Sequence, residues 1–285
     1  HRLLRDQKPD VLHLHSSFAG FVGRIVACLS THRPVIVYCA HGWAFTMQVS
    51  VLKKAFYGLI EYALSFLTDG IVNISEFEAR AATHFHIPQK NMRTIPNGIV
   101  PLVESAPVKD TQHQKTFLFV GRFDKQKGLD LLLKALGAIP QPDFKVWIVG
   151  EGVISNTHYH FPPCVTHFGW LNRVELTKLY CQADALIVPS RWEGFGLVAI
   201  EAMSCATAVL ASIHGALPEI IVDGKTGILF DPDKTAEFAA MLQNVTQEEL
   251  VVMGSAAALH MRNHFTADRM NDALIAFYKE LLTKR

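Results

Sequence analysis

The sequence predicts an α/β protein of two doubly wound, Rossmann-like domains, the first of them incomplete. Short β-branched runs alternate with longer helical patterns along the chain, and this alternation is typical of parallel sheets covered by helices. The chain has 285 residues, which is long enough for two compact cores. Residues 97–115 carry two prolines and many polar residues in no periodic pattern, which indicates a linker.

The first domain is expected to span residues 1–104. Strand patterns lie at 10–15, 34–40, 70–75 and 92–96, and helical patterns lie at 20–30 and 51–67. The chain starts without Met, in what reads as the end of a helix directly before a strand. We therefore expect an upstream part of this domain to be missing.

The second domain is expected to span residues 105–267. Strand patterns lie at 116–122, 144–152, 164–170, 184–190, 208–212 and 226–230. Helical patterns lie at 128–139, 173–183, from about 197 onward, 234–245 and 247–265. We expect the last helix, 268–285, to pack back on the first domain.

Composition narrows the class of protein. Hydrophobic residues make up 49% of the chain and charged residues 19%, which is a globular rather than a disordered profile. A net charge of +1 gives no global field that would attract nucleic acid, so no nucleic-acid partner is expected. Five dispersed cysteines without CxxC spacing indicate reduced, buried thiols and a cytoplasmic protein. The sequence shows neither a signal peptide nor an uncharged apolar run of about 18 residues.

The stretch "VGRFDKQKGLD" follows the first strand of the second domain. The strand ends at Val120, Gly121 makes the turn, Arg122 and Lys127 flank a polar loop, and Gly128 precedes a helix. Ligands of open α/β sheets bind at the carboxyl ends of strands, where helix N-termini point. Two cations at such a place suit a diphosphate. A solvated loop is the alternative.

The stretch "RWEGFGLVAIEAMSC" follows a later strand of the same domain. Glu193 lies in the loop, and Gly194 and Gly196 allow backbone N–H groups to approach a ligand closely. Glu201 lies about one turn into the following helix, where a carboxylate can accept from the vicinal hydroxyls of a ribose. We expect Glu193 to face a sugar hydroxyl. The alternative is that Glu193 favours the helix N-terminus and Glu201 is a solvated helix position.

Four separated motifs, "GRFDKQKG", "GEG", "PSRWEGFGLVAIEAMSC" and "GALPEIIVDGKTGILF", resemble in order and spacing the C-terminal domain of the retaining family-4 glycosyltransferases. These enzymes have the GT-B fold, in which two Rossmann-like domains face a cleft. The segments "DVLHLHSSFAGFVGRIVA", "VYCAHGWAF", "GIVNISEFEA" and "TIPNGI" resemble the N-terminal domain of members that build exopolysaccharide, capsule or O-antigen. The resemblance covers essentially the whole chain.

The resemblance implies roles for individual residues. Arg122 and Lys127 would hold the diphosphate and neutralise the leaving group, Glu201 would bind the ribose, and His41 would lie close to the reacting sugar. Asn97 would lie in the hinge near the cleft. The remaining donor contacts implied are Gly121, Glu193 and the backbone of Gly194, Phe195, Gly196 and Leu197 for sugar and phosphates, and Gly150, Gly152, Phe168 and Trp170 for the base.

The implied reaction moves a sugar from a nucleotide-sugar, UDP-linked in our expectation, to a lipid-linked or growing glycan acceptor with retention. No metal or cofactor is expected, and the chain would work in the cytoplasm, with peripheral contact to the inner membrane as an option. The family is described as front-face, with the leaving phosphate taking the acceptor proton. Two rival interpretations stay open: a non-catalytic nucleotide-sugar-binding protein, and a GT-B sugar-nucleotide epimerase. The missing upstream segment, which carries a glycine-rich loop in the family, would leave donor binding intact and transfer impaired.

Several other sequence features bear on a metal site, on a membrane contact or on the end of a helix. "DPD" at 231–233 resembles a metal-binding D-x-D, but we expect Asp233 to be an N-cap. "HLH" at 13–15 and "HYH" at 158–160 show no third ligand nearby. The helix at 51–67 is expected to pack on the sheet rather than on a membrane. Ala206 and Ala208 replace the family's Gly and Pro, and Ala206 would cost about 1 kcal/mol if φ is positive there.

Overall fold

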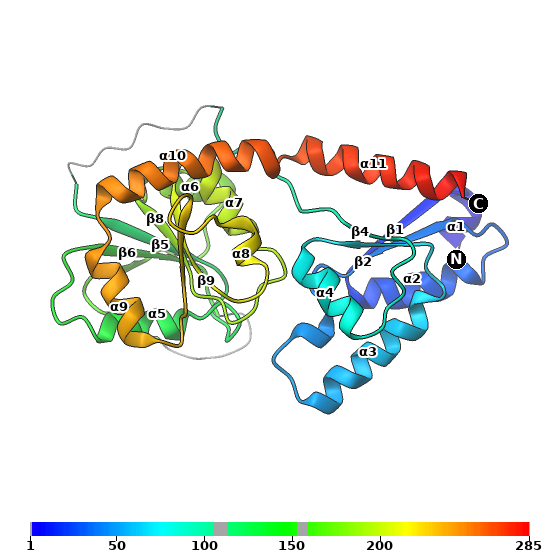
Figure 1. The fold of residues 1–285 in the computed structure, drawn as a ribbon, viewed down its shortest axis with the longest axis horizontal. Coiled ribbons are helices and arrows are strands. Elements are labelled where there is room, and N and C mark those ends of the chain that lie inside the picture. The colour runs from blue at the N-terminus through cyan, green and yellow to red at the C-terminus, as the bar shows by residue number, and fades with distance from the viewer. Residues whose placement is uncertain (1, 105–112, 153–158, 285) are drawn as a thin grey trace. The chain divides into compact units, whose positions relative to one another are not determined.

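The computed structural model of the protein describes residues 2–104, 113–152 and 159–284 (Figure 1). The chain forms two compact units, one of His1–Gly98 with Ala267–Arg285 and one of Ile99–Thr266. Each unit is built on one parallel sheet, so the predicted fold class is confirmed. Part of the predicted linker, 105–112, lies outside the described residues.

The first unit has a four-stranded sheet in the order β1-β2-β3-β4, with every pair parallel. Each strand pattern expected in this part of the chain is present. The short helix η1 and the helix α4 were missed, because α4 is polar and short. The elements are α1 (Arg2–Gln7), β1 (Val11–His15), α2 (Ser17–Cys28), β2 (Val35–Cys39), η1 (Ala44–Thr46), α3 (Val51–Ser65), β3 (Gly70–Asn73), α4 (Glu76–His84), β4 (Met92–Thr94) and α11 (Ala267–Thr283).

Helix α3 is anchored to this unit by buried polar contacts. The Arg24 guanidinium donates to Glu61 over 2.7 Å and lies 3.9 Å above the Tyr38 ring, while the Tyr38 hydroxyl donates to Glu61 over 3.1 Å. Gly58 faces Phe85 too closely for a Cβ. The buried residues of α3 are therefore mostly polar or small.

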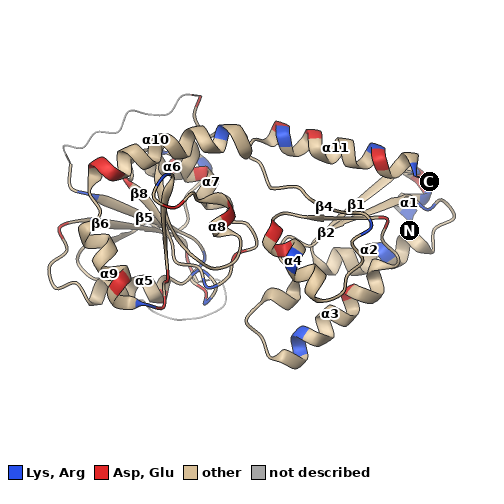
Figure 2. Ribbon diagram, in the orientation of Figure 1, with Lys and Arg blue, Asp and Glu red and all other residues tan. Residues whose placement is uncertain are grey.

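Leu64 of α3 is buried and Tyr57 packs against the core of this unit, whereas four other apolar side chains of the helix point to solvent. Their exposed fractions are Val51 80%, Leu52 83%, Phe56 60% and Leu59 66%. Since Arg24 and Glu61 hold the inner face of α3, the outer face is left apolar. Figure 2 shows a basic band near the start of this helix. In the ranges 2–104, 113–152 and 159–284, none of the helices is long and apolar enough to cross a membrane.

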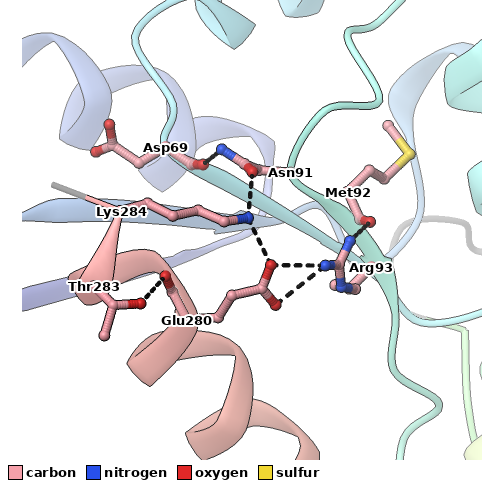
Figure 3. Close-up of polar contacts among 7 residues, drawn as sticks. All are labelled: Asp69, Asn91, Met92, Arg93, Glu280, Thr283 and Lys284. Atoms are coloured by element: carbon pink, nitrogen blue, oxygen red, sulfur yellow. Dashed lines mark hydrogen bonds and ion pairs between the residues drawn. The ribbon is translucent and has the colours of Figure 1, made fainter.

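Helix α11 packs on the same sheet, although it comes from the end of the chain (Figure 1). Phe277 and Leu281 are buried, and an added Cβ on Gly70 would lie 2.6 Å from Leu281 and 2.8 Å from Phe277. Glu280 accepts from Arg93 at 2.8 Å and from Lys284 at 2.6 Å (Figure 3). The close packing of Phe277 and Leu281 on Gly70, together with the cluster of Arg93, Glu280 and Lys284, thus holds α11 on the sheet.

The second unit has a six-stranded parallel sheet in the order β10-β9-β8-β5-β6-β7. All strand patterns expected here are present, and the short helix α8 was missed. The elements are β5 (Thr116–Val120), α5 (Leu129–Gly137), β6 (Lys145–Val149), β7 (Val165–His167), α6 (Arg173–Gln182), β8 (Ala185–Val188), α7 (Leu197–Ser204), β9 (Ala208–Ser212), α8 (Leu217–Ile220), β10 (Gly227–Phe230), α9 (Thr235–Asn244) and α10 (Gln247–His264).

The sequence singled out two helix ends, the end of α7 at Ala206 and the start of α9 at Asp233. Ala206 has φ +55°, and the bonds Thr207 N–H to Ala202 O and Ala206 N–H to Met203 O form a Schellman motif at the end of α7. The condition under which a cost was assigned to Ala206 from the sequence, a positive φ, is therefore met. The prediction that Asp233 caps α9 is wrong: Lys234 is the N-cap residue. The Asp233 N–H instead donates to the Asp231 carboxylate over 3.1 Å, which fixes the segment as a turn.

Candidate functional site

The strand order of the second sheet changes direction between β5 and β8, which makes a topological switch point. The chain runs outward from β5 to β6 and β7, then returns to place β8 on the other side of β5 (Figure 1). A crevice at the carboxyl ends of two such strands is where open α/β sheets bind ligands. The loops that leave this point contain Gly121–Gly128 and Ser190–Gly196, which are the two motifs singled out from the sequence.

An ion pair joins the two loops. Lys127 Nζ lies 2.6 Å from a Glu193 carboxylate oxygen, and Ser190 Oγ lies 3.5 Å from the same oxygen. The Glu193 side chain is 10% exposed and that of Lys127 19%. A buried ion pair is weak evidence for stability, because desolvation offsets the attraction. A cation and an acceptor side by side at a switch point can, however, bind a ligand that carries both a phosphate and a hydroxyl.

Arg122 lies nearer the surface. Its guanidinium pairs with Asp124 at 3.1 Å, and its side chain is 52% exposed. Asp124 also accepts from the Lys127 backbone N–H over 3.0 Å, so one carboxylate orders both Arg122 and Lys127. The partly exposed guanidinium can present its planar fork to a phosphate.

Two glycines allow three loops to converge. Gly128 has φ +72° and Gly150 has φ +131°, which disfavour other residues. A Cβ on Gly128 would collide with the Pro189 carbonyl oxygen, and one on Gly150 with that of Gly121. The loops after β5, β6 and β8 can therefore approach closely only with glycine at these positions. Gly152, at the end of the same segment, is exposed.

Two exposed aromatic residues follow β7. Phe168 is 38% exposed and Trp170 59% exposed. Phe168 meets Trp147 edge to face at 6.1 Å. Aromatic faces left open in this way can stack on a planar base.

The turn into α7 combines a glycine N-cap, a buried aromatic residue and an exposed leucine. Gly196 is its N-cap residue with φ +103°. Phe195 is buried at 4% exposure and packs on Phe265, so it offers only main-chain groups. Leu197, in contrast, is 47% exposed. The Ala216 N–H donates to the Glu193 carbonyl over 3.0 Å and fixes the bend.

Glu201 is a partnered residue rather than a solvated helix position. The buried Tyr180 hydroxyl donates to its carboxylate over 3.0 Å. Burial raises the pKa of Glu201, and the Tyr180 hydrogen bond offsets part of that rise. Sequence reasoning missed Tyr180, because in "RVELTKLYCQA" it reads as an ordinary apolar helix position.

The first unit brings histidines together at the carboxyl ends of β1 and β2. His41 follows β2 with φ +51°, and its Nε2 lies 2.7 Å from His15 Nδ1. His13 Nδ1 lies 2.6 Å from the Tyr278 hydroxyl, and its ring lies 4.1 Å from that of His15. Burial lowers the pKa of His41 and of His15, and it lowers that of His13 to about 4. Neutral imidazoles in a strained backbone are common at functional sites.

The sequence-based statement that "HLH" has no third ligand nearby is wrong. His15 and Cys39 face each other across the β1–β2 pair, and His41 lies two residues beyond Cys39. One ligand atom from each of the three lies within 4.8 Å of the others. The parallel register that joins distant segments was not readable from local sequence. At "DPD", His214 groups with Asp231 and Asp233 within the same limit.

Two further sequence predictions concern other parts of the chain. Asn97 is half-buried and lies just before the division between the units. His158 of "HYH" lies outside the described residues.

Comparisons with known proteins identify what the chain is similar to. The family model "Glycosyl transferases group 1" matches residues 104–262, and "Glycosyltransferase Family 4" matches residues 1–101. An "uncharacterized 41.2 kDa protein in cps region" of Klebsiella pneumoniae is 31% identical over 98% of this chain and 81% of its own length. An Escherichia coli "UDP-Gal:alpha-D-GlcNAc-diphosphoundecaprenol alpha-1,3-galactosyltransferase" is 23% identical over 100% of this chain and 79% of its own.

A solved structure shows the same fold. Anabaena Alr3699/HepE in complex with UDP superposes with a TM-score of 0.81 at 18% identity, over 98% of this chain and 81% of that one. The two parallel sheets described above are thus those of a GT-B glycosyltransferase.

Proposed function

The chain belongs to the group 1 glycosyltransferases, and we propose that it moves a sugar from a UDP-linked donor to a lipid-linked or growing glycan acceptor with retention of the anomeric configuration. The reaction would serve cell-surface polysaccharide or lipopolysaccharide biosynthesis. The observation that carries the proposal is the Lys127–Glu193 pair at the switch point of the second sheet. The UDP-bound Anabaena structure and the undecaprenol-linked substrate in the name of the E. coli relative support it.

In this proposal the donor lies along the carboxyl edge of the second sheet. Lys127 and Arg122 hold the diphosphate, with Gly121 allowing close approach. Glu201, oriented by Tyr180, accepts from the ribose hydroxyls. Glu193 and the backbone of Gly194–Leu197 hold the sugar. The base lies near Gly150, Gly152, Phe168 and Trp170, where exposed aromatic faces suit stacking.

In the proposed reaction, protein cations stabilise the negative charge that develops on the leaving group, without a resident metal or cofactor. As the bond between the anomeric carbon and the diphosphate oxygen breaks, negative charge grows on the leaving group. Lys127 and Arg122 stabilise that charge more in the transition state than in the ground state. The acceptor oxygen bonds to the anomeric carbon on the same face, and the leaving phosphate oxygen takes the acceptor proton. We propose that His41 contacts the reacting sugar, the role that the family resemblance implies for it.

We also propose that α3 contacts the membrane in which a lipid-linked acceptor would lie. Val51, Leu52, Phe56 and Leu59 form an exposed apolar band on α3, with Lys53 and Lys54 at its start. An amphipathic helix of this kind can lie in the interface of an anionic bilayer. We therefore place the chain peripherally on the cytoplasmic face, where a lipid-linked acceptor is presented.

The test combines donor, acceptor and variants. Purified protein in its full-length context is incubated with UDP-sugars with and without a lipid extract, and the products are identified. The proposal expects transfer that needs the extract, is not lost when a metal chelator is added, and falls in Lys127→Ala by roughly 10²–10³-fold. Lys125→Ala, an exposed lysine of the same loop, is the control and should keep activity. A changed sugar-nucleotide with donor alone would indicate an epimerase, and UDP binding without any product would indicate a non-catalytic protein.

A further inference from the structure

We propose that His15, Cys39 and His41 bind a divalent transition-metal ion that accepts both imidazole and thiolate ligands. Zn²⁺ is such an ion and is the one used in the test. The three residues come from the carboxyl ends of β1 and β2, which parallel pairing brings together. His15 and Cys39 are direct register partners, and His41 turns back toward them through its positive φ. One ligand atom from each lies within 4.8 Å of the others.

The spacing is close to what a tetrahedral ion requires. Zn–N bonds of about 2.0–2.1 Å and Zn–S bonds of about 2.3 Å place ligand atoms about 3.3–3.6 Å apart. His15 Nδ1 and His41 Nε2 are now 2.7 Å apart and share a hydrogen bond. Small rotations of the two rings would exchange that hydrogen bond for two metal bonds.

Neutral imidazoles and a thiolate are the ligand forms that bind such an ion, so binding would displace the Cys39 proton. One Zn²⁺ enters and one proton leaves, which gives a site of net charge +1. The two histidines are exposed and give the ion access, while Cys39 lies behind them at 2% exposure.

His13 supports the site without being one of its three ligands. It stacks on the His15 ring, and its Nδ1 contacts Tyr278. Its Nε2 is buried with no hydrogen-bond partner among the residues that the structure describes. Ring orientation fixed by outer contacts of this kind raises the affinity of a metal site.

The consequence for activity rests on the proposed function. If His41 faces the reacting sugar, an ion on its Nε2 removes that contact and inhibits transfer. Metal binding itself depends on neither donor nor acceptor. A failure of the metal proposal can therefore be told apart from a failure of the glycosyltransferase proposal.

The experiment is a Co²⁺ titration of the metal-free chain followed by absorbance. We expect a thiolate-to-cobalt charge-transfer band that Zn²⁺ abolishes by competition. His260 and His264 on α10, with ring centroids 4.6 Å apart, can also bind Co²⁺, but as a pair of imidazoles. The group of His214, Asp231 and Asp233 also lacks a thiol. The thiolate band therefore separates the His15–Cys39–His41 site from both.

Variants make the test decisive. Cys39→Ser should abolish the band, and His15→Ala, at an exposed position, should weaken Zn²⁺ binding by on the order of 100-fold. Cys28→Ser and His32→Ala, from the same unit, are controls that should leave the band unchanged. A wild-type chain without the band, or a His15→Ala chain that binds Zn²⁺ as tightly as wild type, would overturn the proposal.

Discussion

Substitutions in the buried ion pair of Lys127 and Glu193 can separate an effect on the free energy of unfolding from an effect on donor binding. In Lys127→Met the Glu193 carboxylate stays buried without its cation. Breaking a buried pair in this way costs about 3–5 kcal/mol. Because the side chains are 19% and 10% exposed, solvent relieves part of the cost, and we expect a loss near the lower figure, about 3 kcal/mol.

The matching double variant should recover most of that loss. In Lys127→Met/Glu193→Gln the buried charge is absent, and an amide replaces the carboxylate at nearly the same volume. We expect its free energy of unfolding to lie within about 1 kcal/mol of wild type. Donor binding should stay lost in both variants, because the cation is missing in each.

The assay is urea unfolding followed by fluorescence and circular dichroism, with UDP affinity measured by calorimetry. Lys234→Met is the control, since Lys234 and Glu237 form an exposed pair with side chains 56% and 69% exposed. Its loss should not exceed about 0.5 kcal/mol. If Lys127→Met were as stable as the Lys234 control, or if the double variant were no more stable than the single one, the reasoning about this pair would be refuted.

Three more predictions follow from single contacts. Ala206→Gly should stabilise the chain by about 0.5–1 kcal/mol in urea unfolding, since glycine adopts the observed φ of +55° without strain, and an unchanged midpoint would count against the Schellman cap. Because the folded pKa of Glu201 is raised, its carboxyl favours the folded state below that pKa, and this contribution is lost as pH rises through it. Glu201→Gln should therefore be at least as stable as wild type at pH 7 yet bind UDP more weakly, and equal UDP affinity would remove the ribose role. Gly70→Ala should cost about 1–3 kcal/mol by pushing Phe277 and Leu281 away from β3, whereas Gly137→Ala, where a Cβ meets open space, should not destabilise.

Local sequence was sufficient for the strands and for the longer helices of the fold. The strands have runs such as "VIVYC" and "ALIV" that are apolar because both faces of a parallel sheet are buried. Helix α4 was missed because "EFEARAATH" has few apolar residues, and its start depends on the Ser75 cap. The incorrect cap at Asp233 shows a similar limit, since two aspartates compete for the same turn.

The sequence singled out Lys127 and Glu193, each in a loop that follows a strand, but not the contact between them. That 2.6 Å contact depends on β5 and β8 being neighbours. Tyr180 and the His15–Cys39–His41 group were missed for the same reason. Contacts across a sheet or between helices join residues far apart in sequence, and no local pattern encodes them.

The central claim is that the carboxyl edge of the second sheet holds a UDP-sugar. It is tested most directly by calorimetric titration of UDP into the wild-type chain and into Lys127→Met/Glu193→Gln, the variant expected to stay folded. The account predicts saturable binding to wild type and a loss of at least about 1.4 kcal/mol, or tenfold, in the double variant. Equal UDP affinity in the two proteins would contradict it.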